Sequence, residues 1–104
     1  MIRKEIQAKV EYEDDEIFVI RDINPQAPVH VLILPKIHIE KIGDIEAKHI
    51  PLMGNTILRA KQLAAQKGWK DYRLVFNNGP ESGQSVFHIH LHLLSGRRMT
   101  WPPG

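Results

Sequence analysis

The sequence predicts an α+β domain in which a mainly antiparallel five-stranded sheet packs against one main helix. Three observations support this fold class. Short alternating or apolar runs between turn residues indicate strands, one longer stretch has helical periodicity, and that stretch separates the third strand from the fourth. The chain has 104 residues, of which 42% are hydrophobic, enough for a single domain spanning residues 1–104 with a modest core.

Alternation and turn signals place the strands, which we predict at 9–13, 16–21, 29–34, 72–77 and 86–94. The turn signal Asp14-Asp15 joins the first two strands, and the proline-rich segment 24–28 precedes the third. The third is a continuous apolar run, typical of a buried strand, and Pro35 ends it because proline has no N–H for the sheet ladder. Residues 78–83 form a polar loop before the fifth strand.

Residues 51–67 have the periodicity of a helix that packs one face against the sheet. The apolar stripe consists of Met53, Ile57, Ala60 and Ala64. Pro51 suits the first turn of a helix, and Gly68 suits the position just after the last turn.

Composition excludes several classes of function. The net charge of +2 is too small for a nucleic-acid scaffold, and no apolar run approaches the length of a membrane span. The absence of cysteine excludes disulfides and cysteine-ligated zinc. The first residues lack the apolar run of a secretory signal. We therefore expect a cytoplasmic protein with no nucleic-acid or membrane partner.

Three histidines alternate with aliphatic residues in the fifth predicted strand. In an extended strand His88, His90 and His92 point to one face, whereas the residues between them point to the core. A row of imidazoles can be a solvated polar face, a metal site or a nucleophilic site. A strand does not easily aim three such positions at one ion, because the outer two lie about 13 Å apart. Nucleophilic catalysis uses all three rings, with a central nucleophile, a neighbour that orients it and a proton donor.

The loop ahead of this row supplies neutral donors and glycines. The segment Asn77 to Ser85 contains two glycines, which permit close backbone approach, and such a loop can gather amides around phosphate oxygens. Ordinary turns have the same composition. The position directly before the histidines favours a phosphate loop.

The segment from Gly83 to Leu94 resembles the signature of the histidine triad family, in which three histidines alternate with apolar residues. The tail Gly96 to Gly104, with its Trp-Pro-Pro-Gly end, resembles that of the purine nucleoside phosphoramidase branch. Further segments resemble the branch in order: 2–9, 13–15, 22–28, 35–36 and 38–39. The resemblance covers nearly the whole chain, and the helix matches least. It implies the fold of that family and a homodimer whose two sheets join into one of ten strands, with the tail 96–104 at the interface.

The resemblance also implies residue roles. His90 would be the nucleophile, His88 would orient its ring, His92 would contact the phosphate, and His30 would be a fourth active-site histidine. The implied nucleotide contacts are Asp22 for ribose hydroxyls, Asn77, Gly83, Gln84 and Ser85 for phosphate, and Ile20 and Trp101. His38 and His49 receive no role. The resemblance implies no metal and no cofactor.

The implied reaction cleaves the P–N bond of a purine nucleoside 5′-phosphoramidate, releasing an AMP-like monophosphate and an amine through a nucleotidyl-histidine intermediate. Two alternatives remain open. One is a dinucleoside polyphosphate hydrolase or nucleotidyl transferase, and the other is a non-catalytic nucleotide-binding interaction protein. The chain departs from the branch where Ile20 replaces a frequent aromatic residue and Arg21 a frequent histidine, and in lacking a short segment before Ile2. We expect these departures to alter the base pocket.

Overall fold

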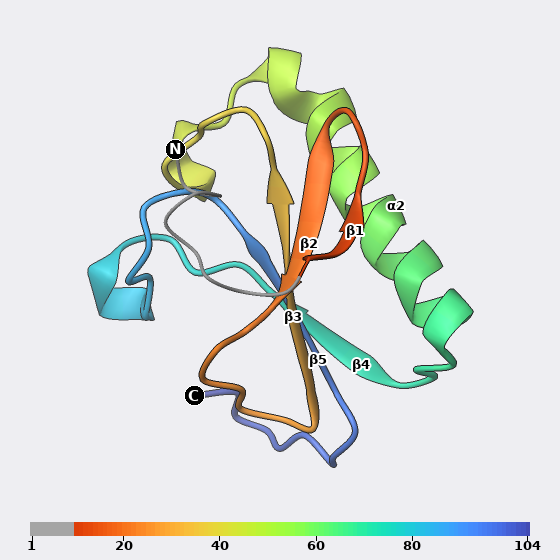
Figure 1. The fold of residues 1–104 in the computed structure, drawn as a ribbon. Helices are drawn as coiled ribbons and strands as arrows, with labels where there is room; N and C mark the ends of the chain where they lie inside the picture. The colour runs from red at the N-terminus through yellow and green to blue at the C-terminus, as the bar shows by residue number, and fades with distance from the viewer. Residues whose placement is uncertain (1–9) are drawn as a thin grey trace.

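The computed structural model describes residues 10–104, which form one antiparallel sheet with a long helix across one face (Figure 1). The strands are β1 (Val10–Glu13), β2 (Ile17–Arg21), β3 (Val29–Pro35), β4 (Tyr72–Val75) and β5 (Leu91–Ser95), in the spatial order β1-β2-β3-β5-β4. The helix is α2 (Ile50–Lys67), and the short 3-10 helices η1 (Ile42–Asp44), η2 (Ala47–His49) and η3 (Pro80–Ser82) lie in the connections. The predicted α+β class and the order of its elements are confirmed.

The fifth strand is shorter than predicted. It begins at Leu91, which pairs with Ile33 of β3, so residues 86–90 lie outside the sheet. The chain leaves the ladder because the Ile89 N–H donates to the carbonyl oxygen of Ile39 at 2.6 Å, and because β3 ends at Pro35, which has no N–H. The fourth strand likewise ends at Val75 instead of residue 77. Lys9, the first residue of the predicted first strand, lies outside the described residues.

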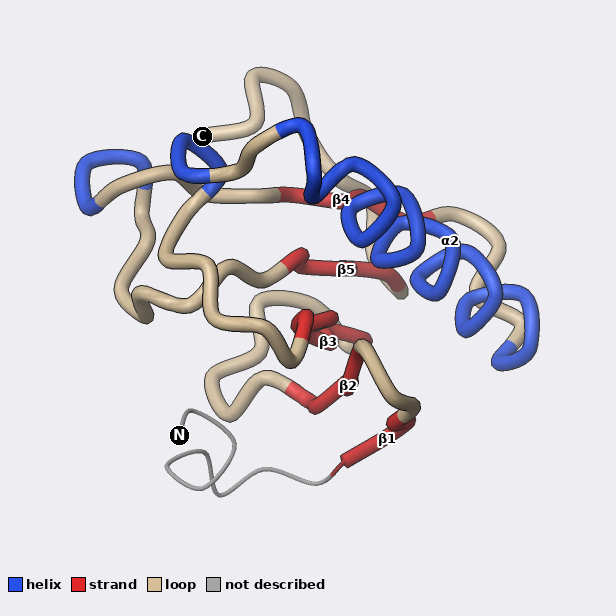
Figure 2. Tube along the Cα trace, turned by 90° about the horizontal axis from the view of Figure 1, so that it is seen from above, coloured by secondary structure: helices blue, strands red, loops and turns tan. Residues whose placement is uncertain are grey.

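One face of the sheet packs against α2 (Figure 2). Alternate residues of the strands point toward the helix, as the two-residue period of a strand requires. The buried cluster comprises Ile17, Val19, Val31, Ile33, Leu91 and Leu93 of the sheet with Ala60, Leu63 and Ala64 of the helix. Gly68 ends α2 with φ of 77°, a left-handed conformation that glycine adopts without strain, as predicted.

The intervening residues point to the opposite face of the sheet. There Phe18, Ile20 and Leu34 form a second buried cluster with Leu32 beside them. Leu32 pairs with His92 across the two central strands, and His30 pairs with Leu94. His30 and His92 therefore lie on the face away from α2. Among the described residues, no helix is both long and apolar enough to cross a membrane.

Candidate active site

A cavity of about 380 Å³ opens on the sheet face that carries His30 and His92. Its walls come from β2, β3, β5 and the loops that follow or precede them. Seven of the residues predicted from the sequence line it: Ile20, Asp22, His30, Gly83, Ser85, His90 and His92. Four others, His88, Asn77, Gln84 and Trp101, do not. The structure thus brings together residues that are up to 72 positions apart in the chain (from Ile20 to His92).

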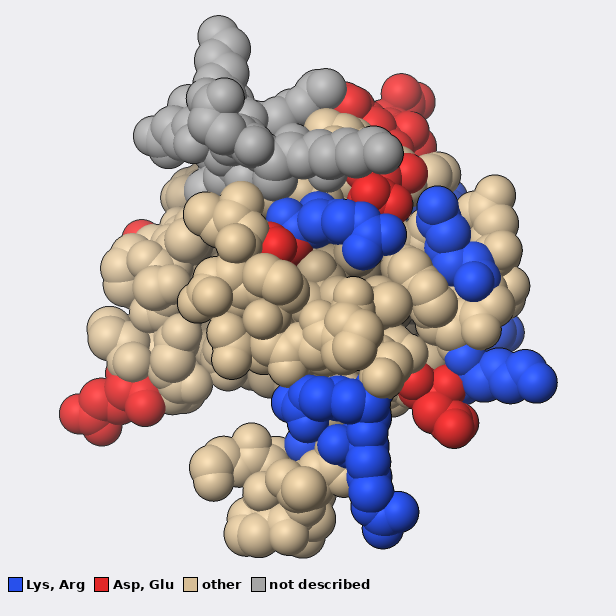
Figure 3. All heavy atoms as spheres, turned by 60° about the horizontal axis from the view of Figure 1, so that its bottom comes forward, with Lys and Arg blue, Asp and Glu red and all other residues tan. Residues whose placement is uncertain are grey.

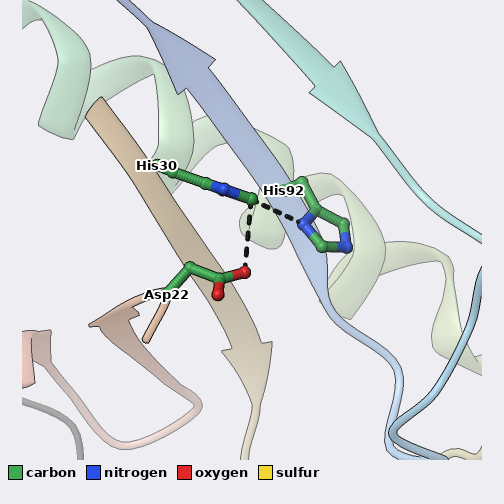
Figure 4. Close-up of side chains that lie close together, drawn as sticks. All are labelled: Asp22, His30 and His92. Atoms are coloured by element: carbon green, nitrogen blue, oxygen red, sulfur yellow. Dashed lines mark hydrogen bonds and ion pairs between the residues drawn. The ribbon is translucent and has the colours of Figure 1, made fainter. Parts of the chain in front are cut away.

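Two histidines and an aspartate meet at the centre of this face (Figure 4). His30 Nε2 lies 2.9 Å from His92 Nδ1 and 3.4 Å from an oxygen of Asp22. The Asp22 carboxylate also accepts the N–H of Asn24 at 2.8 Å, so it shapes the local turn as well. The Asp22 side chain therefore both stabilises the turn and belongs to the candidate site.

Hydrogen bonds determine which ring nitrogens hold protons. The Gln26 backbone N–H donates to His30 Nδ1 at 3.0 Å, so that nitrogen is an acceptor. In the neutral ring the proton of His30 is therefore on Nε2, from which it is donated to His92 Nδ1. His92 Nδ1 is in turn an acceptor, and the proton of neutral His92 lies on Nε2. The relay from Gln26 through His30 makes His92 Nε2 a hydrogen-bond donor.

The opposite tautomer is fixed at His90. Its Nδ1 lies 2.7 Å from the backbone carbonyl oxygen of His88, which can only accept. The proton of neutral His90 is therefore on Nδ1, and Nε2 keeps an unshared electron pair. His90 lines the cavity, and its ring centroid lies 4.9 Å from that of His92. A lone-pair nitrogen and an N–H donor thus stand side by side.

The predicted row of three histidines on one face is wrong at His88. This residue precedes β5, its side chain is 2% exposed, and its Nε2 donates to the Pro35 carbonyl oxygen at 2.7 Å. His88 Nδ1 lies 3.2 Å from Nδ1 of His38, a residue for which the sequence predicted no role. His88 contacts His90 through its backbone oxygen, so its position still determines how the His90 ring is held.

Burial lowers the pKa of three of these histidines. The pKa of His92 falls to about 4, because burial and then the neighbouring His90 and His30 disfavour the charged ring. Burial also lowers the pKa of His30, against the opposing influence of Asp22, and that of His88. Burial thus favours the neutral form of each of these three rings.

The loop before the histidines is held by the side chain of Gln84, which is 4% exposed. Its Oε1 accepts the Gly79 N–H at 2.8 Å, and its Nε2 donates to the carbonyl oxygens of Glu40 and Val86. The Gln84 amide is therefore engaged with backbone and does not line the cavity. Ser85 does line it, and neither its amide nor its hydroxyl donates a hydrogen bond within residues 10–104. Ser85 therefore offers free donors to the cavity within the part of the chain that the structure describes.

Asn77 and Trp101 lie elsewhere. Asn77 lines a neighbouring hollow of about 210 Å³ together with His30, His92 and Leu94. Its amide nitrogen stands 3.6 Å from the place where a Cβ on Gly83 would lie, and Gly83 has a positive φ of 106°. Trp101 is 81% exposed in the single chain and contacts no part of the cavity.

Ile20 and Arg21, at which the sequence departs from the branch that it resembles, lie in different surroundings. Ile20 is buried and forms part of the cavity wall. The Arg21 side chain pairs with Glu11 at 3.0 Å on the neighbouring strand. Arg21 also lines the cavity, and its guanidinium is held there by the pairing with Glu11.

The sequence missed several cavity residues. The further lining residues are Arg21, Ile23, Asn24, Gln26, Leu32 and Val86. Most are apolar or act through the backbone, so no pattern of side-chain chemistry marks them. The sequence did offer a signal for His38, because the segments 35–36 and 38–39 resemble the family.

Asp22, His30 and His92 also offer ligand atoms to a metal, all within 4.8 Å of one another. One carboxylate oxygen and two imidazole nitrogens suit zinc, although the described residues provide only these three ligands at that point. The His30–His92 hydrogen bond uses the same nitrogens, so an ion would replace that bond.

Comparisons with known proteins agree with this fold and arrangement. The family model described as "HIT domain" matches residues 3–99. The "14 kDa zinc-binding protein" of Zea mays is 50% identical over all of this chain and 84% of its own length. "Adenylylsulfatase HINT1" of Arabidopsis thaliana is 45% identical over all of this chain and 73% of its own length. A crystal structure of a "HIT family hydrolase from Legionella pneumophila Philadelphia 1" superposes with a TM-score of 0.93 at 52% identity, covering 100% of this chain and 95% of that one.

Proposed function

Because this chain belongs to the HIT domain family, we propose that it is a nucleotide-binding hydrolase. Its reaction is cleavage of the P–N bond of purine nucleoside 5′-phosphoramidates, which yields a nucleoside monophosphate and an amine. One observation carries the proposal: His90 donates its Nδ1 proton to the His88 carbonyl, which leaves its Nε2 as a nucleophile beside the N–H donor of His92. A relative described as an adenylylsulfatase and a neighbour described as a hydrolase are consistent with it.

The reaction takes two displacements at phosphorus. In the first, His90 Nε2 forms a bond to the α-phosphorus while the P–N bond breaks, the His92 Nε2–H donates a hydrogen bond to a phosphate oxygen, and the departing amine takes a proton from water. In the second, the resulting hydroxide attacks the same phosphorus and the bond to His90 breaks, which restores the neutral ring. The Ser85 amide and hydroxyl stabilise the charge on the phosphate oxygens.

The nucleoside lies toward β2. There the Asp22 carboxylate accepts from ribose hydroxyls, and the apolar side chains of Ile20, Ile23, Leu32 and Val86 surround the purine. Phosphate contacts from Gly83 and Asn77 lie on the other side of His92, toward β4. Gln84 supports this loop from behind through its three hydrogen bonds.

A homodimer is the assembly that we propose. Strand β4 is an edge strand with one side unpaired among the described residues, so two copies can continue their sheets into one of ten strands. The tail 96–104 then lies at the interface, where Trp101 would lose its exposure to water. Light scattering at micromolar concentration should give twice the chain mass of 12.0 kDa. A particle of one chain mass would contradict the dimer.

Zinc binding is a second candidate function. The grouping of Asp22, His30 and His92 favours it, as does the maize relative described as zinc-binding. An ion there would occupy the nitrogens of the His30–His92 relay, so zinc would oppose the hydrolase reaction.

The proposed function is tested with two substrates and one variant. We expect the wild type to cleave an adenosine 5′-phosphoramidate much faster than a diadenosine polyphosphate, and His90→Asn to lose at least a thousandfold in kcat/KM, as removal of a nucleophile does. Wild-type turnover by the variant would refute the nucleophile. Activity that a chelator abolishes and zinc restores would favour a metal-dependent reaction instead.

A further inference from the structure

A second and larger cavity, of about 660 Å³, lies at the end of the sheet beside the tail. Three arginines, Arg73, Arg97 and Arg98, line it together with Tyr72, Ser95 and Met99. Asp71 is the one acidic residue in its wall. Figure 3 looks onto this end of the molecule and shows Lys and Arg side chains gathered beside the protruding tail.

These arginines have no carboxylate partner within 4 Å in the part of the chain that the structure describes, whereas Arg21, Lys36 and Arg59 are ion-paired elsewhere. Arg73 donates to the Thr100 carbonyl oxygen, and Arg97 to those of Gln26 and Arg98. These contacts hold the tail but leave the charges uncompensated within one chain. Because β4 and the tail also form the homodimer interface proposed above, the cavity lies beside that interface. The Arg98 guanidinium donates to no group in residues 10–104.

The cavity continues the face that carries the reactive histidines. Arg73 pairs with Leu94 in the sheet register and Val75 pairs with His92, so Arg73 and His92 project from the same face, two residues apart along their strands. Two residues span about 7 Å. Gln26 joins the two regions, because its N–H donates to His30 and its carbonyl accepts from Arg97.

The position of the arginine cavity across the sheet indicates which part of a substrate it would contact. The nucleoside end of the site lies on β2, the reacting histidines lie on β3, on β5 and directly before β5, and the arginines lie on β4 and the tail. A substrate with its nucleoside at β2 and its phosphorus at His90 extends its leaving group toward β4, the side on which the arginines lie.

We propose that the arginine cavity binds an anionic group on the leaving-group side of the substrate, either a carboxylate on the departing amine or a further phosphate. The proposal rests on the proposed function for the direction in which the substrate lies. Guanidinium groups bind carboxylates and phosphates through paired, charge-assisted hydrogen bonds. The enzyme would thus prefer acidic leaving groups.

Binding and turnover are measured with two matched ligands, the adenosine 5′-phosphoramidate of β-alanine and that of its neutral carboxamide. Calorimetry on His90→Asn, which does not consume them, should show about tenfold tighter binding of the carboxylate at low salt, a preference that shrinks at high salt. Adding Arg98→Gln should reduce the preference to about twofold or less, and Arg73→Gln should do likewise. Lys61→Gln removes an equal charge from α2, at a residue that does not line the arginine cavity, and should keep the preference.

Equal affinity for the two ligands, or a preference that survives Arg98→Gln, would overturn the proposal whether or not the wild type turns them over. The proposed function fails separately, if both ligands bind and neither is cleaved by the wild type. A diadenosine polyphosphate in the same titration identifies the source of the anion. Tighter binding of the carboxylate ligand assigns the cavity to acidic amines, and tighter binding of the polyphosphate assigns it to phosphates.

Discussion

The rings of His30, His90 and His92 have the same chemistry, and different hydrogen-bond partners give them different properties. A backbone N–H acts on His92 through His30, and a backbone carbonyl acts on His90, so the two neighbouring rings of His92 and His90 have opposite tautomers. The His90 ring is thereby a nucleophile and the His92 ring a hydrogen-bond donor. Both determinants are backbone groups, so side-chain identity alone does not reveal them.

Nitrogen-15 NMR of the histidine rings at pH 7 tests this assignment. We expect His90 to be protonated at Nδ1 and His30 and His92 at Nε2, because these are the atoms that the hydrogen bonds leave with a proton. The exposed ring of a short histidine-containing peptide serves as a mixed-tautomer reference. Protonation of His90 at Nε2 would contradict the assignment, since that nitrogen would then have no lone pair for attack.

Among the predicted site residues, those with distinctive side-chain chemistry are the ones that the structure brings into one cavity. His30, His90, His92 and Asp22 line the cavity as the histidine motif and the resemblance indicated. His88 was misplaced because alternation along a segment assumes that the segment is a strand, and the ladder ends at Leu91. That end depends on Pro35 and on the Ile89–Ile39 contact, both remote in sequence.

At the scale of elements, the loop before β5 depends on one buried amide. The Gln84 side chain forms hydrogen bonds with one backbone N–H and two carbonyl oxygens. Its neighbour Ser85 donates no hydrogen bond within residues 10–104. The resemblance implied phosphate contacts for both residues. The structure divides these roles, because only Ser85 has a side chain that faces the cavity.

Two substitutions distinguish the residue that holds the loop from the residue that contacts the phosphate. Gln84→Ala leaves buried backbone groups without partners and should lower the free energy of unfolding by about 2 kcal/mol, together with activity. Ser85→Ala should change the free energy of unfolding by less than about 0.5 kcal/mol while lowering kcat/KM roughly tenfold or more. Urea unfolding and turnover of the phosphoramidate give both quantities. A Gln84→Ala protein with the wild-type unfolding midpoint would show that the amide does not hold the loop.

The type of an element could be predicted where a short stretch of sequence determines it. The helix periodicity and Gly68 predicted α2 to within one residue, because both are properties of a short stretch. The ends of β4 and β5 were not predicted correctly, because pairing with a distant strand determines them. The 3-10 helices in the connections have no periodic pattern and were missed.

At the scale of the whole molecule, neutral buried histidines make stability depend on pH. The unfolded chain binds a proton at His92 near pH 6.5, whereas the folded chain does so only near pH 4. Stability from this residue is therefore complete above about pH 6.5 and is lost as the pH falls toward 4. His30 and His88 act in the same direction, because burial lowers their pKa values too.

We expect the free energy of unfolding to fall by on the order of 2 kcal/mol or more between pH 7 and 4.5. A His92→Asn variant should lose part of this slope, because asparagine does not titrate, and His49→Asn, outside the site, should keep it. Urea unfolding at a series of pH values provides the measurement. A stability that is constant over this range would mean that the histidines are charged, or solvated, in the folded protein.

The central claim is that His90 attacks phosphorus. Rapid quenching of the wild type with an adenosine 5′-phosphoramidate, followed by peptide mass spectrometry, tests it most directly. The account predicts an adenylyl group on His90 that forms and decays within a turnover and is absent from His90→Asn. Turnover without any adduct in the wild type, or an adduct on a different residue, would contradict it.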